Sequence, residues 1–496
     1  MGIPSYYRRL IKSIEGFYCS RPDEVDRLLM DYNCLIYQVL RELPQGSGHQ
    51  WERDFINEIC KYTGKVIETA QVKSDKVFIA MDGIVPLAKM RQQRMRRFRA
   101  AATATHGAWD TNAITPGTTF MINLANALRK EFPSATISDT GEFGEGEHKL
   151  MSFMRTLKSK ESNIAIYGLD GDLFVLGLLN RAMYCPWANI FFLREKTDQS
   201  SCGELIWHSL QALTAGLLRE KHMDIDINEW IKEYAIAMSL LGNDFVPNGL
   251  SFRIRENGHE RLMTYLRRLH GAGLRLRAEE GLSFEGWSQI FKWLAADEER
   301  FMTKALQQKK SAVMAAKGHY GAEDLPLQMF EESDGLLLSD RGTLKRDWPK
   351  LYATHGLGAP AGHEIHYLTD SARQYLNSIE WTYNYYCKGD KHVSFDWMYP
   401  YGSAPLFGPV SAIFKGFGSF STDATKPIVN EQLAIVLPPS SWYLIPKCEQ
   451  RQLLIKAPWL FPKGELKYNT FGKRFTWECE AEIPIPTISE VRSILK

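Results

Sequence analysis

Acidic residues recur in this sequence directly after short apolar runs that have the length and composition of buried strands. Asp31 follows LLM, Asp82 follows FIAM, and the pair Asp170 and Asp172 follows IYGL. The carboxyl ends of parallel strands meet at one edge of an open α/β sheet, and ligands bind beyond that edge. These carboxylates are therefore expected to lie close together, where they could bind hard divalent cations.

Two further segments add acidic side chains of the same kind. The run GEFGEGEH places Glu145 and Glu147 on a glycine-rich turn that opens a helix, and LGNDF places Asp244 at a turn after an apolar helix. Each acidic residue alone could be a turn former or a helix cap. Crowded carboxylates repel one another unless cations neutralise them, so the group as a whole favours a site for two Mg²⁺ or Mn²⁺ ions. Such a pair can hold the attacking and leaving oxygens of a phosphodiester.

A basic segment follows Asp82. Residues 89–99, KMRQQRMRRFR, contain six basic side chains on an expected helix. At helical spacing Lys89, Gln93, Arg96 and Arg97 share one face. That face could bind a terminal phosphate, since arginine offers paired donors. A solvated basic face or a nuclear-import patch is the alternative. The segment begins only seven residues after Asp82, which favours contact with substrate.

The elements that must position these residues predict an α/β fold with a mainly parallel central sheet flanked by helices. We expect a catalytic domain over 1–255, a helical connector over 256–365 with Trp287 and Trp293 at helical spacing, and a second lobe over 366–496 that closes the active-site pocket. Expected strands cover 25–30, 76–81, 163–169 and 189–193, expected helices cover 35–40 and 118–130, and residues 474–483 have a strand-like pattern.

Bulk properties exclude several classes of protein. The net charge is only +2 and 44% of the residues are hydrophobic, which is typical of a globular protein rather than a disordered one. The eight cysteines form no C-x-x-C pair, and the HEIH run at 363–366 lacks zinc-protease spacing. No apolar run is long enough for a membrane span, and the start lacks a signal peptide. We expect an intracellular monomer, in the cytoplasm rather than the nucleus.

The order of these motifs resembles the Xrn-type 5′→3′ exoribonucleases, within the wider 5′-nuclease (PIN-like) group. The resemblance covers most of residues 1–255 and 370–486. It is carried by MGIP, the strand that runs into Asp31-Tyr32-Asn33, VFIAMDGIVPLAKMRQQRMRRFR, NAITPGTTFM, GEGEHKLMSFMR, IYGLDGDLFVLGL, LLGNDFVPN, YLNSIEWTYNYYCKG, WMYPYGSAPL, LAIVLPPSSWYLIP and GKRFTWECEAEIPIP.

The resemblance implies processive hydrolysis of single-stranded RNA with a 5′ monophosphate to 5′-mononucleotides. It implies that Lys89, Gln93, Arg96 and Arg97 form the pocket for the 5′ phosphate, with Lys89 also stabilising charge near the scissile phosphate. It also implies that two Mg²⁺ or Mn²⁺ ions are held by Asp31, Asp82, Glu145, Glu147, Asp170, Asp172 and Asp244.

The sequence departs from the family pattern in two respects. Tyr37 stands where the family has a histidine that stacks on the first base, so only the aromatic face is retained. The second stacking aromatic is placed at Trp381, for which a role in the core is an equal alternative. The stretch after RRFR and the connector are both short, and a compact member without the C-terminal accessory domains is expected.

Two other functions remain open. The chain could be a structure-specific 5′ nuclease on DNA or flaps, although the Xrn-like second lobe favours a single strand threaded into the site. It could also be a catalytically inactive RNA-binding scaffold. That alternative predicts missing acidic ligands, whereas all seven positions are filled.

Overall fold

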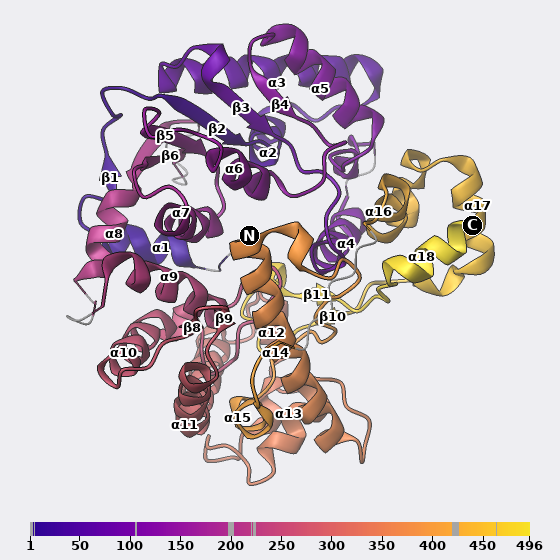
Figure 1. The fold of residues 1–496 in the computed structure, drawn as a ribbon. Coiled ribbons are helices and arrows are strands. Elements are labelled where there is room, and N and C mark those ends of the chain that lie inside the picture. The colour runs from indigo at the N-terminus through magenta and orange to yellow at the C-terminus, as the bar shows by residue number, and fades with distance from the viewer. Residues whose placement is uncertain are drawn as a thin grey trace.

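The apolar runs that end in acidic residues form the central strands of one sheet. In this computed structural model β2 (Arg27–Asp31) pairs in parallel with β3 (Val77–Ala80) on one side and with β5 (Asn163–Tyr167) on the other. The parallel part continues through β4 (Thr136–Ser138) beyond β3 and through β6 (Asn189–Glu195) beyond β5. The strand order β1-β7-β6-β5-β2-β3-β4 confirms the predicted, mainly parallel α/β architecture (Figure 1).

Two antiparallel strands complete the sheet at one edge. β7 (Leu205–Ser209) pairs with β6, and β1 (Tyr18–Cys19) pairs with β7. The sequence patterns did not predict either strand. The structure describes residues 3, 5–104, 107–196, 203–219, 221, 225–418, 426–462 and 464–496.

Helices cover both faces of the sheet because successive side chains of each central strand point to opposite faces. Leu28 and Met30 of β2 pack in one core and Leu29 packs in the other. The first core is closed by α2 (Asn33–Glu42), α3 (Gly48–Ala70) and α5 (Thr119–Glu131). The second is closed by α1 (Tyr6–Ser13), α6 (Gly146–Met154), α7 (Asp172–Met183), α8 (Leu210–Leu218) and α9 (Ile227–Ala237) (Figure 1).

The chain reverses its direction of travel across the sheet at β2. From β2 it proceeds to β3 and β4 on one side, and it later returns to β5 and β6 on the other. Such a switch point leaves a crevice at the carboxyl ends of the strands. Asp31 is the last residue of β2, and α4 (Leu87–Ala102) begins shortly after β3.

The region between the sheet and the C-terminal part is mostly helical. Its elements are α10 (Gly258–Gly271), the short hairpin β8 (Arg277–Ala278) and β9 (Gly281–Leu282), α11 (Phe284–Ala316), α12 (Leu325–Gln328), α13 (Trp348–Gly356) and α14 (Glu364–Lys388). Trp287 on α11 is fully buried, and Trp293 is partly buried against the same core. The predicted boundary at 365 falls at the start of α14, which continues into the second lobe.

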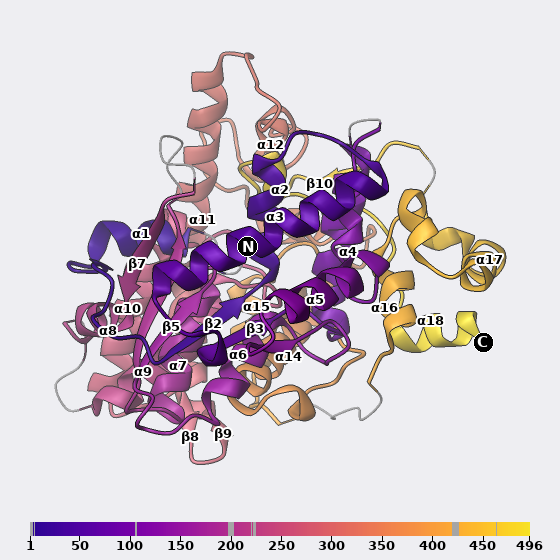
Figure 2. The same cartoon turned by 90° about the horizontal axis from the view of Figure 1, so that it is seen from above.

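The C-terminal part lies against α4. It contains α15 (Phe407–Ile413), α16 (Val429–Val436), α17 (Lys447–Lys456), the hairpin β10 (Tyr468–Asn469) and β11 (Glu480–Ala481), and α18 (Ile488–Leu495). Met90 and Phe98 of α4 share a core with α16 and α18. Figure 2 shows α16, α17 and α18 grouped beyond α4 at one side of the molecule.

The expectation of a strand over 474–483 is wrong for most of that range. Residues Thr476–Glu478 form a 3₁₀ turn and only Glu480–Ala481 are extended in a sheet. The Glu478 carboxylate accepts the backbone N–H groups of Arg474 and Phe475, at 2.7 and 3.3 Å. These bonds curl the chain back on itself and remove the donors that a strand would need.

None of the helices within the described ranges is both long enough and apolar enough to cross a lipid bilayer.

Candidate active site

The carboxylates that end β2 and follow β3 meet the first turn of α6. The Gly146 N–H donates to Asp82 Oδ1 at 2.8 Å, and the Asn33 amide donates to Asp82 Oδ2 at 2.8 Å. A β-carbon on Gly146 would lie 2.5 Å from Asp31 Oδ1, closer than any normal contact. The glycine therefore permits α6 to approach Asp31 and Asp82, and it brings Glu145 and Glu147 to the same place.

Lys89 lies among these carboxylates. Its ammonium is paired with Glu145 and donates to Asp244 Oδ2 at 2.6 Å. Tyr385 of α14 donates to the other oxygen of Glu145 at 3.0 Å. Burial would lower the pKa of Lys89, but Asp244 and Glu145 outweigh this effect and raise it, so the ammonium stays charged. The site is thus assembled from three distant parts of the chain.

The remaining acidic residues crowd the same space. Burial, together with Asp82, Asp170 and Asp172, raises the pKa of Asp31 well above its usual value. The pKa of Asp172 rises to about 7, first through burial and then through Asp170 and Asp244. For Asp244 the ammonium of Lys89 outweighs burial and holds the pKa at about 2. Within the described residues, the seven carboxylates outnumber the Lys89 ammonium that contacts two of them.

This shortage of positive charge fits a site for divalent cations. The Oδ1 atom of Asp172 is buried and has no hydrogen-bond partner among the described residues. One ligand atom from each of Glu145, Glu147 and His148 lies within 4.8 Å of the others. Burial lowers the pKa of His148 to about 3, so its imidazole is neutral. Hard oxygen donors at this density are what Mg²⁺ and Mn²⁺ prefer. All seven predicted acidic ligands thus lie in one cluster.

The predicted phosphate residues of α4 divide between two places. Lys89 belongs to the carboxylate cluster, whereas Gln93 and Arg97 are buried on the next turns of the helix, 2% and 5% exposed. The Arg97 Nε donates to Thr115 Oγ1 at 2.8 Å. The Gln93 Oε1 and one terminal nitrogen of Arg97 find no partner in the described ranges. Unpaired buried polar atoms are costly, and these two offer a ready site for a ligand.

Arg96 and Tyr37 lie beside this pair. The guanidinium carbon of Arg96 is 5.9 Å from the centre of the Tyr37 ring, which is only partly buried on α2. Burial lowers the pKa of Arg97 to about 10, and both Tyr37 and Arg96 are close enough to influence it. The structure therefore brings together the predicted first stacking aromatic and the predicted phosphate residues.

Not every basic residue of α4 faces this site. Arg94 is fully buried and points toward the C-terminal lobe, where it donates to the backbone carbonyls of Pro484, Ile435 and Leu460. Arg91 forms a paired ion bridge with Glu480 at 2.9 and 2.6 Å. These two arginines fasten α4 to the second lobe.

The predicted second stacking residue does not have a free face. Trp381 is fully buried, its indole donates to the Ser394 carbonyl at 2.9 Å, and it packs against Phe245 and Trp397. In this arrangement Trp381 is a core residue. Trp477 is different, because it is 46% exposed and its ring lies parallel to Phe475 at 5.7 Å.

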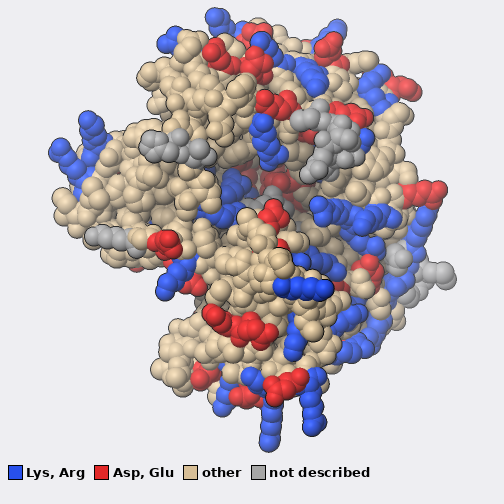
Figure 3. Space-filling model, turned by 180° about the vertical axis from the view of Figure 1, so that it is seen from behind, with Lys and Arg blue, Asp and Glu red and all other residues tan. Residues whose placement is uncertain are grey.

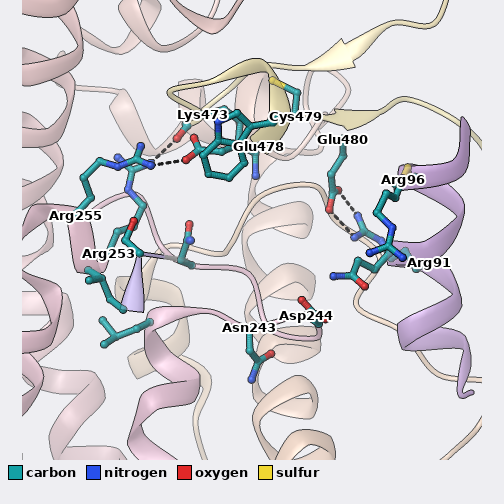
Figure 4. Close-up of a pocket in the computed structure, with 18 of the residues that line it drawn as sticks. Arg91, Arg96, Asn243, Asp244, Arg253, Arg255, Lys473, Glu478, Cys479 and Glu480 are labelled. Atoms are coloured by element: carbon teal, nitrogen blue, oxygen red, sulfur yellow. Dashed lines mark hydrogen bonds and ion pairs between the residues drawn. The ribbon is translucent and has the colours of Figure 1, made fainter. Parts of the chain in front are cut away.

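Trp477 lines an open pocket of about 350 Å³ between α4, residues 241–255 and residues 472–480 (Figure 4). Arg96 and Asp244 also line it, so it opens into the carboxylate cluster. Its rim carries Arg99, Arg253, Arg255 and Lys473. On the face opposite to that of Figure 1, Lys and Arg side chains gather around a central hollow (Figure 3). Such a pocket can accommodate a polyanion with aromatic groups.

Sequence reasoning missed three residues of this site. Asn33 lies two positions after Asp31, and the sequence did not indicate its bond to Asp82. Tyr385 belongs to an aromatic run that indicated a core. Trp477 lies in the run GKRFTWECEAEIPIP, which carries part of the resemblance, but its place in the site was not predicted because the surrounding residues have a strand-like pattern.

Two family models match the chain. The model described as XRN 5′-3′ exonuclease N-terminus matches residues 1–108 and 102–196, and the Xrn1 helical domain matches residues 344–494. These segments contain most of the acidic cluster, all of α4, and Trp477.

Named relatives agree with the models. The chain is 28% identical to human 5′-3′ exoribonuclease 1, over 99% of this chain and 34% of the human protein. It is 30% identical to 5′-3′ exoribonuclease 1 of Saccharomyces cerevisiae, over 50% of this chain and 19% of that protein. It is also 30% identical to 5′-3′ exoribonuclease 2 of Candida albicans, over 53% of this chain and 36% of that protein. The chain thus spans about a third of these relatives or less. The two family models match the two lobes that together form the acidic site. The chain therefore belongs to the Xrn family.

Proposed function

We propose that the chain is a metal-dependent 5′→3′ exoribonuclease that hydrolyses 5′-monophosphorylated single-stranded RNA to 5′-mononucleotides. The observation that carries the proposal is the position of α4. Near its start, Lys89 enters a buried cluster of seven carboxylates, and one and two turns later Gln93 and Arg97 keep buried polar atoms without partners among the described residues. A catalytic site and an end-binding site therefore lie on one short helix.

The carboxylate cluster would hold the metal ions. Asp31, Asp82, Asp170 and Asp172 come from the sheet edge, Glu145 and Glu147 from α6, and Asp244 from the turn after α9. Two bound Mg²⁺ or Mn²⁺ ions would supply an activated water and stabilise charge on the leaving oxygen. Lys89 would contribute a fixed positive charge beside the phosphodiester. Burial of the cluster keeps bulk water from competing with these interactions.

The end pocket would select the 5′ terminus. Arg97 offers a buried guanidinium whose free nitrogen can donate to a phosphate oxygen, and Gln93 and Arg96 lie on the same side of the helix. A charged donor in a pocket without water forms strong hydrogen bonds with a compact anion such as a single phosphate. A 5′ hydroxyl lacks the anion, and a triphosphate or a cap would bring a larger group than the single phosphate that these residues would bind.

The open pocket would hold the strand. Trp477 supplies an exposed aromatic face in the pocket, and the partly buried Tyr37 beside Arg96 supplies another; base stacking on such faces contributes roughly 1–3 kcal/mol per base. Arg96 and Lys473 supply charge for the backbone. A strand held this way stays bound while successive nucleotides leave, which is the basis for proposing processive action.

The test offers short RNAs that differ only at the 5′ end, as monophosphate, hydroxyl and triphosphate, plus matched single-stranded and flap DNA, with Mg²⁺ or Mn²⁺. We expect mononucleotides from the monophosphorylated RNA, and no activity in Asp170→Ala/Asp172→Ala. Arg97→Met should reduce the preference for monophosphate over hydroxyl by roughly tenfold or more, since a charge-assisted bond contributes about 1.5–3 kcal/mol.

Other outcomes would support other functions. Equal hydrolysis of hydroxyl and monophosphate ends by the wild type would refute the end pocket. Cleavage of flap DNA with little RNA hydrolysis would identify a structure-specific DNA nuclease. RNA binding without hydrolysis under every metal condition would identify an inactive scaffold.

A further inference from the structure

The segment that carries Trp477 is attached to the helical connector. We call residues 470–480 the Trp477 segment. Phe471 inserts into the connector's core, where its ring meets Tyr352 edge-on at 5.3 Å. The Thr476 N–H donates to the Glu323 carbonyl at 2.9 Å, and its hydroxyl donates to the Ala322 carbonyl at 3.1 Å. The position of Trp477 therefore depends on residues more than a hundred positions earlier.

The firmest attachment is at Gly472. Its N–H donates to Asp334 Oδ1 at 2.8 Å, and its carbonyl accepts from Arg253 at 2.5 Å. Gly472 has a φ of +72°, a conformation that glycine adopts without strain. Both backbone groups of this residue are thus held, one by the connector and one by the wall of the open pocket.

Asp334 is a buried charged residue of the connector. It is 0% exposed, its second oxygen is bonded to Lys309 of α11, and that lysine is itself buried. A buried ion pair is a poor source of stability, because desolvation offsets most of its attraction. The arrangement does, however, fix one carboxylate oxygen toward Gly472.

On the other side, α4 completes the attachment. Arg99 donates to the carbonyls of Trp477 and Cys479, at 2.7 and 3.3 Å, and Arg91 is bridged to Glu480. The Trp477 segment consequently spans from the connector to the helix that carries the end pocket. Figure 4 shows Lys473, Glu478 and Cys479 along one side of the pocket and Arg91 and Arg96 along another.

We infer that Asp334 is a positioning residue for RNA, acting through Gly472 to place Trp477 over the pocket. The connector would then set how firmly the strand is gripped without touching it. This inference rests on the proposed function, since it assigns the open pocket to RNA. Asp334 should also hold the Trp477 segment in place in the free protein, which can be measured without RNA.

The test compares two variants that both lack the buried charges. Lys309→Met/Asp334→Asn keeps an oxygen that can accept the Gly472 N–H, whereas Lys309→Met/Asp334→Ala removes it. In hydrogen exchange followed by mass spectrometry, we expect peptides covering 470–480 to exchange about tenfold faster in the alanine variant, as expected for lost local protection. The asparagine variant should remain close to the wild type.

Kinetics on 5′-monophosphorylated RNA give the functional readout. The alanine variant should raise KM roughly tenfold, the scale of one lost stacking contact, with kcat little changed. Adding Trp477→Ala to it should raise KM no further than Trp477→Ala alone, because both changes remove one interaction.

The outcomes separate the two claims. Wild-type protein that does not degrade RNA would refute the proposed function, and the exchange measurement would still decide whether Asp334 holds the segment. Active wild-type protein with unchanged exchange in the alanine variant, or with additive effects of the Asp334 and Trp477 changes, would overturn the positioning role.

Discussion

The charge of Lys89 serves both the folded protein and the proposed reaction. Its ammonium is 13% exposed and contacts Glu145 and Asp244, which come from opposite sides of the crevice. Among the described residues, this lysine is a direct counter-charge for the cluster. Removing it leaves buried carboxylates without compensation, which typically costs about 3–5 kcal/mol.

Lys89→Met should therefore be strongly destabilised when no divalent ion is present. We expect a lower melting temperature in a chelator, and a larger rise on adding Mg²⁺ or Mn²⁺ than the wild type shows, because the ions replace the missing charge. Thermal unfolding across a metal titration measures both effects. Lys61→Met is the matched control, because Lys61 is 71% exposed and its pair with Glu58 contributes little. Equal metal-induced shifts in the wild type and Lys89→Met would show that Lys89 and the ions do not share a site.

At the scale of elements, the site depends on how closely α6 approaches the ends of β2 and β3. Gly146 is the point of contact, since its N–H binds Asp82 and its missing side chain leaves room for Asp31. The same residue separates Glu145 from Glu147. A displacement of this turn would therefore shift carboxylates on both sides of the crevice.

Gly146→Ala should fold but lose activity by at least about a hundredfold, because misplacement of catalytic groups by about 1 Å has effects of that size. The new methyl group would lie 2.5 Å from Asp31 Oδ1 and 2.9 Å from the Ala80 carbonyl, so α6 must retreat. The comparison is with Gly64→Ala on α3, where nothing lies within 4 Å and alanine favours the helix. Steady-state RNA hydrolysis and circular dichroism of both variants provide the measurement. An active Gly146→Ala protein would mean that the turn tolerates displacement.

The elements also show how far sequence reasoning could reach. Apolar runs ending in Asp31, Asp82 and Asp170 predicted parallel strands, since burial on both faces leaves an unbroken hydrophobic pattern. Connectivity then required the carboxylates to converge. The exposure of Trp477 could not be predicted, because a turn closed by Glu478 and bonds to residues 322–323 decide it. Trp381 is the converse case. It lies on α14 and is buried in a core whose other residues are distant in the sequence, so its burial could not be predicted.

At the scale of the whole molecule, the catalytic region cannot be complete without the second lobe. Tyr385 reaches Glu145, and Gln432, which is fully buried, accepts the Val85 N–H at 2.9 Å between Asp82 and α4. Each contact bridges more than 200 positions of the chain. Conditions that loosen the packing between distant helices should therefore disturb the site as well.

Mild acid is such a condition, because the packing of three helices involves a buried histidine. Tyr6 of α1, Tyr234 of α9 and His259 of α10 form a chain of hydrogen bonds of 2.7 and 2.9 Å. Burial, with a contribution from Arg9, lowers the pKa of His259 to about 4. The folded protein thus keeps this imidazole neutral, whereas the unfolded chain takes up a proton below its usual pKa of about 6.5.

The contribution of His259 to stability should be fully present above pH 6.5 and should be lost as the pH falls toward 4. Between pH 7.5 and 5.0 this linkage amounts to roughly 2 kcal/mol of unfolding free energy. His259→Gln can still bond to Tyr234 but cannot titrate. Between pH 7.5 and 5.0 its unfolding free energy should therefore fall by roughly 2 kcal/mol less than that of the wild type. Urea unfolding of both proteins at the two pH values measures the difference. Equal losses of unfolding free energy in the wild type and His259→Gln would show that His259 takes up its proton equally in the folded and unfolded states. Other groups would then cause the acid sensitivity.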